Sequence, residues 1–150
     1  MDAYFLDTSA LFKRYRPEEG SAAVEALFNQ QAARFISEIT LLEVLSNLRR
    51  LVDVDKIVTP EEFDTLRATF LKDIADENLE VVRLTSTIIV KSLVIASQRY
   101  ITPIDAIQLA TAVSMAETPV FVCADQKLLR LATEEGLEVL DVSRDVPAEK

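Results

Sequence analysis

The sequence predicts a three-layer α/β/α domain, in which helices cover both faces of a mainly parallel sheet. Short apolar segments of high β-propensity alternate along the chain with longer segments whose apolar residues fall at helical spacing. This alternation is typical of parallel sheets, because parallel neighbours are joined by a crossover that is usually a helix. At 150 residues the chain is long enough to bury one core, so we expect a single domain over residues 1–150.

The expected strands are short, apolar and bounded by polar or turn residues. The first is followed directly by Asp7, and the fourth is followed by Asp125. Pro119 separates the fourth strand from the helix before it, and Gly136 precedes the fifth. In chain order these strands are 3–6, 34–36, 79–84, 120–124 and 137–142.

The expected helices show clear start and stop signals. The pattern turns helical after Ala10 and Leu11, and a basic polar turn is expected over 13–16. Thr59-Pro60-Glu61-Glu62 combines a capping box with proline at the first helical position. Gly136 is a C-terminal stop signal. The later helices are expected at 21–31, 37–52, 60–76, 85–100, 102–117 and 126–135, the third forming a hairpin with the second.

The composition excludes several classes of active site. The chain contains no histidine, one cysteine and two glycines. Imidazole catalysis, zinc fingers, the Walker phosphate loop and the dinucleotide fingerprint are therefore absent. Any catalysis must use carboxylates, hydroxyls, amides, lysine or arginine, which favours a hard cation such as Mg²⁺ or Mn²⁺. The net charge of −9 argues against a bulk electrostatic grip on nucleic acid.

Two further observations concern the cellular setting. No apolar run approaches the ~20 residues that span a bilayer, and the first residues lack a basic flank typical of signal peptides. The single Cys123 cannot form a disulfide within the chain. We therefore expect no membrane association and a reducing, cytoplasmic location.

Four carboxylates stand at positions where parallel α/β sheets keep their chemistry. Asp7 and Asp125 end strands, so both should project from the same sheet edge. Asp105 lies in the first turn of an apolar helix, and Glu43 lies in a helix whose other faces are mostly apolar. Each has a simpler interpretation: Asp7 and Asp125 as N-caps, Asp105 as part of a Thr-x-x-Asp capping box, and Glu43 as a solvated residue. Asp141, also near a strand end, is treated as a surface residue.

Electrostatics decides what convergence of these acids would mean. Two carboxylates ~5 Å apart repel by about 3 kcal/mol at an effective dielectric constant of about 20. Four together would cost about 15–20 kcal/mol, more than the ~5–15 kcal/mol stability of a typical domain. They must therefore be protonated, spread apart or bound to cations. With no lysine or histidine expected beside them, one or two divalent ions are the simplest solution, and such a pocket suits phosphodiester hydrolysis.

Four segments resemble, in order and spacing, the motifs of the PIN domain family, with the VapC-type toxins of prokaryotic toxin–antitoxin pairs as the most similar branch. The resemblance covers almost the whole chain. The segments are Leu6-Asp7-Thr8-Ser9-Ala10-Leu11, Ser37-Glu38-Ile39-Thr40-Leu41-Leu42-Glu43-Val44, Ile104-Asp105-Ala106-Ile107-Gln108-Leu109-Ala110 and Cys123-Ala124-Asp125-Gln126-Lys127-Leu128-Leu129.

The resemblance implies a Mg²⁺- or Mn²⁺-dependent endoribonuclease of the toxin type. It places Asp7, Glu43, Asp105 and Asp125 in an acidic metal site, with Ser9 as a supporting hydroxyl. The branch often has histidine where Gln108 stands, a position that is not a ligand. The resemblance also implies a homodimer and a small VapB-like antitoxin that inserts a basic residue into the acidic pocket.

Substrate contacts and alternative functions remain open at this stage. The basic residues after the first motif are candidates for contacting RNA phosphates, or else they form a solvated turn; they are Lys13, Arg14 and Arg16. An Asp-nucleophile phosphatase would need a second acid where Ser9 stands. A catalytically silent PIN-like module that serves as a binding or scaffold protein is the alternative of another class.

Overall fold

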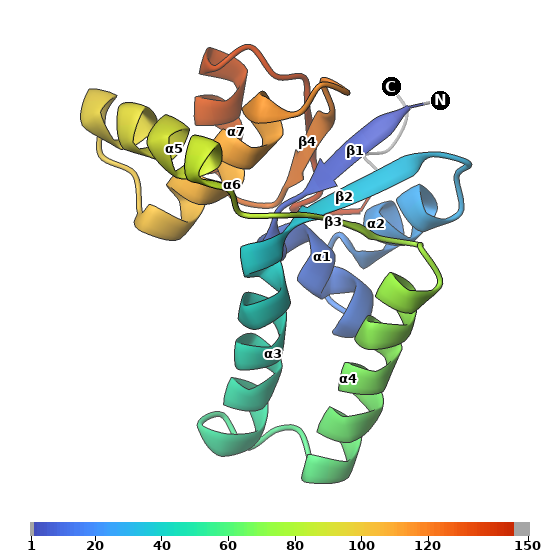
Figure 1. Ribbon diagram of the computed structural model, residues 1–150. Coiled ribbons are helices and arrows are strands. Elements are labelled where there is room, and N and C mark those ends of the chain that lie inside the picture. Colours follow the sequence, from blue (N-terminus) through green and yellow to red (C-terminus); the bar gives the residue numbers. More distant parts are fainter. Residues whose placement is uncertain (1, 146–150) are drawn as a thin grey trace.

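The computed structural model describes residues 2–145 and contains one parallel sheet between two layers of helices (Figure 1). Every strand pairing in the sheet is parallel, and the spatial order is β3-β2-β1-β4-β5. This confirms the predicted fold class. The strands are β1 (Ala3–Leu6), β2 (Ala33–Ser37), β3 (Glu80–Val82), β4 (Val120–Cys123) and β5 (Val139–Asp141).

Seven helices connect these strands within residues 2–145, and their positions follow the predicted segments with ends shifted by a few residues. They are α1 (Thr8–Tyr15), α2 (Ser21–Phe28), α3 (Glu38–Asp53), α4 (Pro60–Ala75), α5 (Ser86–Gln98), α6 (Pro103–Ser114) and α7 (Gln126–Glu134). Among the described residues, every helix is too short or too polar to cross a membrane.

The core is divided by the sheet, because successive side chains of a strand point to opposite faces. Phe5 and Phe121 stack with ring centroids 5.7 Å apart on the face covered by α5, α6 and α7. Leu6 and Val122, the next residue of each strand, face α1 to α4. Figure 1 shows the two groups of helices on opposite sides of the sheet. The three central strands are therefore buried on both faces, as a parallel sheet requires.

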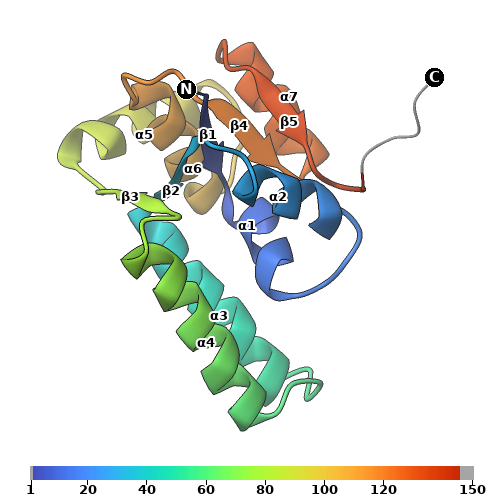
Figure 2. The ribbon, with the colours of Figure 1, turned by 90° about the vertical axis from the view of Figure 1, so that its right-hand side faces the viewer.

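Helices α3 and α4 form the predicted hairpin, which projects away from the sheet (Figure 2). The capping box at the start of α4 is formed: the Glu62 amide donates to the Thr59 hydroxyl, and the Thr59 amide donates to the Glu62 carboxylate. Phe70 packs the C-terminal half of α4 against α1, since its ring lies edge-on to that of Tyr15 with the centroids 5.3 Å apart.

The polar turn expected over 13–16 was wrong. Helix α1 continues through Lys13 and Arg14 to Tyr15. Leu11 and Tyr15 lie one helical turn apart, and both are buried, so packing extends the helix beyond the point where local polarity indicates a turn.

The connection between α1 and α2 contacts the segment that follows β5. Gly20 has a positive φ of 95°, and a Cβ atom there would lie 2.0 Å from the carbonyl oxygen of Val142. The Asp145 carboxylate accepts hydrogen bonds from the amides of Gly20 and Ala22 at 3.1 and 3.2 Å. Only glycine fits this approach, which ties the end of the described chain to the beginning of α2.

Candidate active site

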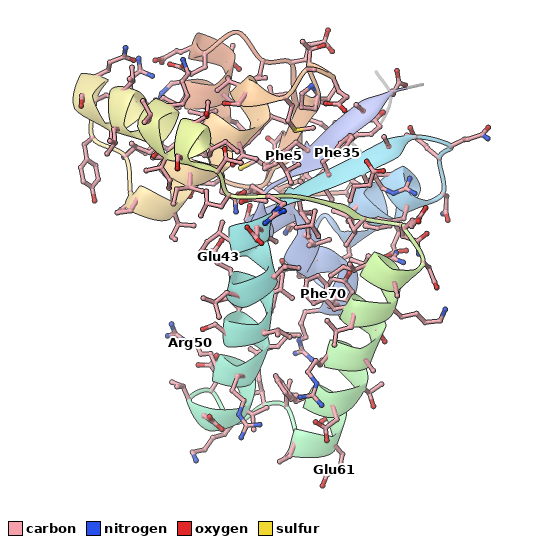
Figure 3. The ribbon with its side chains drawn as sticks, viewed as in Figure 1. Phe5, Phe35, Glu43, Arg50, Glu61 and Phe70 are labelled. Carbon is pink, nitrogen blue, oxygen red and sulfur yellow. The ribbon has the colours of Figure 1, made fainter. Side chains whose placement is uncertain are left out.

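The four predicted acids line one pocket of about 200 Å³ at the carboxyl edge of the sheet. The pocket lies beyond the ends of β1 and β4, where the strand order changes direction and α/β folds commonly bind ligands. Figure 3 shows Glu43 at the end of α3 that adjoins the sheet. We call this the acidic pocket; its lining residues are Asp7, Thr8, Ser9, Glu43, Asn47, Asp105, Gln108 and Asp125.

Asp7 is held at the junction of β1 and α1. It is the N-cap of α1, and its Oδ1 accepts hydrogen bonds from the Ser9 hydroxyl at 2.8 Å and the Ala10 amide at 3.2 Å. The Ser9 oxygen in turn accepts from the Ala124 amide at 3.1 Å, just after β4. Ser9 therefore joins the ends of the two central strands and orients Asp7. Asp7 therefore both caps α1 and lines the acidic pocket.

Burial changes the acidity of Asp7. Its side chain is 4% exposed, and desolvation raises its pKa from 3.8 to about 6. The hydrogen bonds from Ser9 and Ala10 oppose this rise, because they stabilise the charged form, while the negative charge of Asp105 adds to it. The protein thus keeps a carboxylate in an environment that disfavours its charge, a common property of functional sites.

Glu43 is partly buried and hydrogen-bonded, so it is not simply a solvated residue of α3. Its Oε1 accepts from the Thr8 hydroxyl at 2.6 Å and from Nε2 of Gln108 at 3.2 Å. These donors belong to α1 and α6, which fix the Glu43 side chain from two other elements. Glu43 therefore lines the acidic pocket from α3, held by hydrogen bonds from α1 and α6.

Asp125 and Asp105 form the other side of the pocket. Asp125 is the N-cap of α7, and its Oδ1 accepts from the Leu128 amide at 3.1 Å. The capping box that was the simpler interpretation of Asp105 is not formed, since the Thr102 side chain makes no capping hydrogen bond. Burial raises the pKa of Asp105 and the charge of Asp125 adds to this, while the Thr102 side chain and the charge of Lys127 oppose it. The expectation that no lysine stands near the acids was wrong for Lys127.

The donor chemistry fits a hard divalent cation, because the pocket offers four carboxylates and hydroxyl and amide oxygens. The carboxylates share the pocket without converging on a point: across residues 2–145, no group of three Asp, Glu, His or Cys side chains is arranged as a metal site. An ion held by three of them would require side-chain rotations. Spreading of the acids is one of the outcomes that electrostatics allowed for this cluster, whereas a pKa of about 6 leaves Asp7 mostly charged at neutral pH.

Asp141 does not line the acidic pocket. Its carboxylate accepts from the Gln126 side chain at 2.8 Å and from the Ser143 amide at 2.8 Å. These hydrogen bonds hold the end of β5, and they agree with the expectation that Asp141 is a surface residue.

The basic residues after the first motif are used mainly by the fold. Lys13 is buried; it donates to the Glu18 carboxylate at 3.1 Å and to the Glu19 carbonyl. Arg14 makes two hydrogen bonds to Asp73, at 2.8 and 3.0 Å. These contacts favour a structural role for Lys13 and Arg14 over RNA binding. Arg16 makes no ion pair within residues 2–145 and borders a groove between α1 and α4.

Three further polar residues belong to the site and were not assigned a role from the sequence. Asn47 lines the pocket one turn beyond Glu43, and Thr40 lies one turn before it. Gln108 lies three residues after Asp105 and therefore on the same face of α6. Helical spacing from an acid is the signal that links each of them to the pocket.

A larger hollow of about 650 Å³ lies elsewhere, lined by residues around Asp2, Pro119 and Gly136. It lies at the amino ends of β1 and β4, on the opposite sheet edge from the acidic pocket. Parallel α/β sheets bind ligands at the carboxyl ends of their strands, so we regard the smaller acidic pocket as the active-site candidate.

Comparison with known structures shows what this fold is similar to. The fold is similar to FitAcB from Neisseria gonorrhoeae, with a TM-score of 0.70, 15% identity and coverage of 93% of this chain and 98% of that chain. It is also similar to VapBC2 from Rickettsia felis bound to a promoter DNA fragment, with a TM-score of 0.65, 18% identity and coverage of 93% of this chain and 98% of that chain. A toxin–antitoxin complex from Klebsiella pneumoniae has a TM-score of 0.65 and 18% identity, with coverage of 94% of this chain and 98% of that chain. At these identities the similarity shows the fold alone.

Sequence comparison is more specific. No curated protein sequence shows significant similarity to the chain. The profile of the PIN domain family matches residues 4–134, a range that includes all four acids of the pocket. Together with the fold and the composition of the acidic pocket, this match shows that the chain belongs to the PIN domain family.

Proposed function

We propose that this PIN domain is the toxin of a toxin–antitoxin pair and hydrolyses RNA phosphodiester bonds with the help of Mg²⁺ or Mn²⁺. The observation that carries the proposal is the meeting of Asp7, Glu43, Asp105 and Asp125, from four separate segments, in one pocket at the sheet edge. Membership of the PIN domain family and the fold shared with toxin–antitoxin structures support it.

The residues have distinct roles in this proposal. Asp7, Glu43 and Asp105 would hold the principal ion, and Asp125 would orient water or complete a second ion site. Bound there, the ion lowers the pKa of water and neutralises charge on the phosphate. Ser9 keeps Asp7 oriented through its 2.8 Å hydrogen bond. The backbone amides of Ala10 and Leu128 fix one oxygen each of Asp7 and Asp125, so these carboxylates approach the substrate in defined orientations.

The surface charge limits how RNA binds. The net charge of −9 disfavours long contacts with the phosphate backbone, so recognition must rely on the pocket and a few nearby cations. Arg16 remains a candidate from the sequence. Lys127, whose positive charge acts on Asp105, is a second candidate and lies closer to the acids.

An antitoxin is the proposed regulator. One of the similar structures is a toxin–antitoxin complex, and another is VapBC2 bound to a promoter DNA fragment. A negative pocket in a negative protein would attract a basic side chain from such a partner. A small open reading frame beside the gene, whose product suppresses cleavage when the two are made together, would support this assignment.

We also propose that the protein is a homodimer that pairs through α5. This helix exposes an apolar stripe, with Val90 58% and Leu93 61% exposed and with Ile89 and Val94 beside them. A stripe of this kind at helical spacing is typical of helix–helix interfaces.

Replacing Leu93 with glutamate should weaken the dimer at least about tenfold, because a buried charge has no partner there. Sedimentation velocity over a concentration series measures the change. Leu71→Glu, at an exposed apolar residue of α4, is the matched control and should leave the dimer intact. A wild-type protein that sediments as a monomer throughout the series would contradict the dimer proposal.

Removal of divalent ions should abolish cleavage of total RNA by the purified protein. EDTA should reduce cleavage to background, and excess Mg²⁺ or Mn²⁺ should restore it, because the proposal assigns the activation of water to an ion held by the four acids of the pocket. The measurement is gel analysis of RNA digested with and without EDTA. Cleavage that persists in EDTA, with contaminating nuclease excluded, would contradict the proposal.

The arrangement of the acids keeps one alternative relevant. Because no three acids of the described chain form a metal site as they stand, a silent PIN-like scaffold is the second candidate. Calorimetric titration with Mn²⁺ separates the two functions: binding favours the nuclease, and no heat at millimolar ion favours the scaffold.

A further inference from the structure

A layer of neutral polar side chains lies beneath the acidic pocket. Gln108 of α6 is only 1% exposed, and Thr8 of α1 and Thr40 of α3 are also buried. Most polar groups at such depth are hydrogen-bonded, because burial without partners is unfavourable. Their partners therefore indicate what the layer does.

The hydrogen bonds of this layer lead to Glu43. Nε2 of Gln108 lies 2.8 Å from the Thr40 hydroxyl, 3.1 Å from the Thr8 hydroxyl and 3.2 Å from Oε1 of Glu43. The Thr8 hydroxyl donates to the same Oε1 at 2.6 Å. Since Thr8 gives its single proton to Glu43, its oxygen can only accept from Gln108 or from Thr40, which is 3.1 Å away. Gln108 Nε2 carries two protons for these three acceptors, and its shortest contact is to Thr40. The donors that lie against Oε1 of Glu43 are therefore the Thr8 hydroxyl and Nε2 of Gln108.

The orientation of the Gln108 amide follows from the same contacts. Its carbonyl Oε1 is buried and has no hydrogen-bond partner within the described residues. Turning the amide over would place that carbonyl oxygen against Oε1 of Glu43, where two acceptors would face each other. The amide is therefore oriented for Glu43, although its own carbonyl is left unpaired.

We infer that Gln108 is a positioning residue, which acts with Thr8 and Thr40 to hold Oε1 of Glu43 so that Oε2 faces the acidic pocket. Within residues 2–145, Oε2 accepts no hydrogen bond. This inference rests on the proposed function, because it assigns Glu43 to a metal ion. Gln108 itself contacts neither the ion nor RNA in this arrangement.

The competing explanation is structural: Gln108 would only pair the buried hydroxyls of Thr8 and Thr40. The two explanations differ in what the loss of the amide changes. A structural role alters the stability of the fold, whereas a positioning role alters ion affinity and kcat of a protein that remains folded.

The test compares Gln108→Met, which keeps the shape and removes the donor, with Thr111→Val as the matched control. Thr111 is fully buried in the same helix, but its hydroxyl donates to the Ile107 carbonyl, away from the pocket. Mn²⁺ affinity is measured by calorimetry, kcat and KM on a defined RNA, and folding by thermal denaturation.

For Gln108→Met we expect Mn²⁺ affinity and kcat to fall on the order of 10–100-fold, with KM for RNA little changed. Thr111→Val should keep the wild-type Mn²⁺ affinity and the wild-type kcat. If Gln108→Met does not fold, Thr40→Val replaces it, with Thr40→Ser expected to restore ion affinity.

The outcomes separate this inference from the proposed function. Wild-type Mn²⁺ affinity and kcat in a folded Gln108→Met protein would overturn the positioning role and leave the nuclease proposal standing. A wild-type protein that neither binds Mn²⁺ nor cleaves RNA would overturn both.

Discussion

Replacing Asp7 with asparagine is expected to abolish RNA cleavage and, at the same time, to stabilise the metal-free protein. Activity should fall on the order of 10³-fold or more, because the deepest carboxylate of the pocket loses its charge. The fold should persist, since the asparagine Oδ1 can accept the same hydrogen bonds from Ser9 and Ala10 and asparagine is a good N-cap.

The stabilisation follows from the raised pKa of Asp7. In the folded protein this pKa is about 6, against 3.8 for the unfolded reference, so the folded state binds the proton more tightly. The cost of keeping Asp7 charged is absent below about pH 4, grows as the pH rises to about 6, and is complete above that. It amounts to about 3 kcal/mol. Asparagine avoids this cost, so the melting temperature should rise by several degrees at neutral pH.

Two measurements check this prediction: RNA cleavage, and thermal denaturation in EDTA at about pH 5 and about pH 7.5. The stability difference between Asp7→Asn and wild type should be larger at the higher pH. Asp2→Asn, at the opposite end of β1, is the control and should change neither property. An Asp7→Asn protein that cleaves RNA at the wild-type rate would show that Asp7 has no part in the chemistry.

Replacing Asp73 with alanine is expected to destabilise the protein by about 3 kcal/mol, the largest loss of stability that we predict. Asp73 is buried in α4 and accepts from Arg14 and from the Tyr15 hydroxyl at 2.7 Å. Burial acts to raise the pKa of Asp73, but the hydrogen bonds from Arg14, Tyr15 and Asn78 outweigh it and hold the pKa below its usual value. Without Asp73, the Arg14 charge and the Tyr15 hydroxyl would lose their shared partner.

Urea denaturation measures this loss. Asp64→Ala is the matched control in the same helix, because Asp64 is exposed and pairs with Arg67 at 3.6 Å; it should cost less than about 1 kcal/mol. Equal effects of the two substitutions would mean that the buried network contributes no more than a surface pair.

The sequence was most informative where local pattern and function coincide. Strands that end on an acid placed Asp7 and Asp125 at one sheet edge, because the carboxyl ends of parallel strands lie together. The capping box at Thr59 identified the start of α4, since its partners are three residues apart. Such features depend on neighbours in sequence and can be predicted without coordinates.

Features that depend on distant neighbours could not be predicted. Arg14 and Asp73 are far apart in sequence, so nothing near Arg14 indicates that its charge is already paired. The layer of Thr8, Thr40 and Gln108 joins three helices whose packing is known only from the fold. Lys127 was visible beside Asp125, but its effect on Asp105 depends on how α6 and α7 meet.

The close approach of Gly20 to Val142 has a consequence for synthesis of the protein. The turn between α1 and α2 gains two of its hydrogen bonds only when Asp145 is present. Residues up to Asp145 must therefore leave the ribosome before these hydrogen bonds can form. A chain that stops before Asp145 would lack these two hydrogen bonds, although it would contain every acid of the pocket.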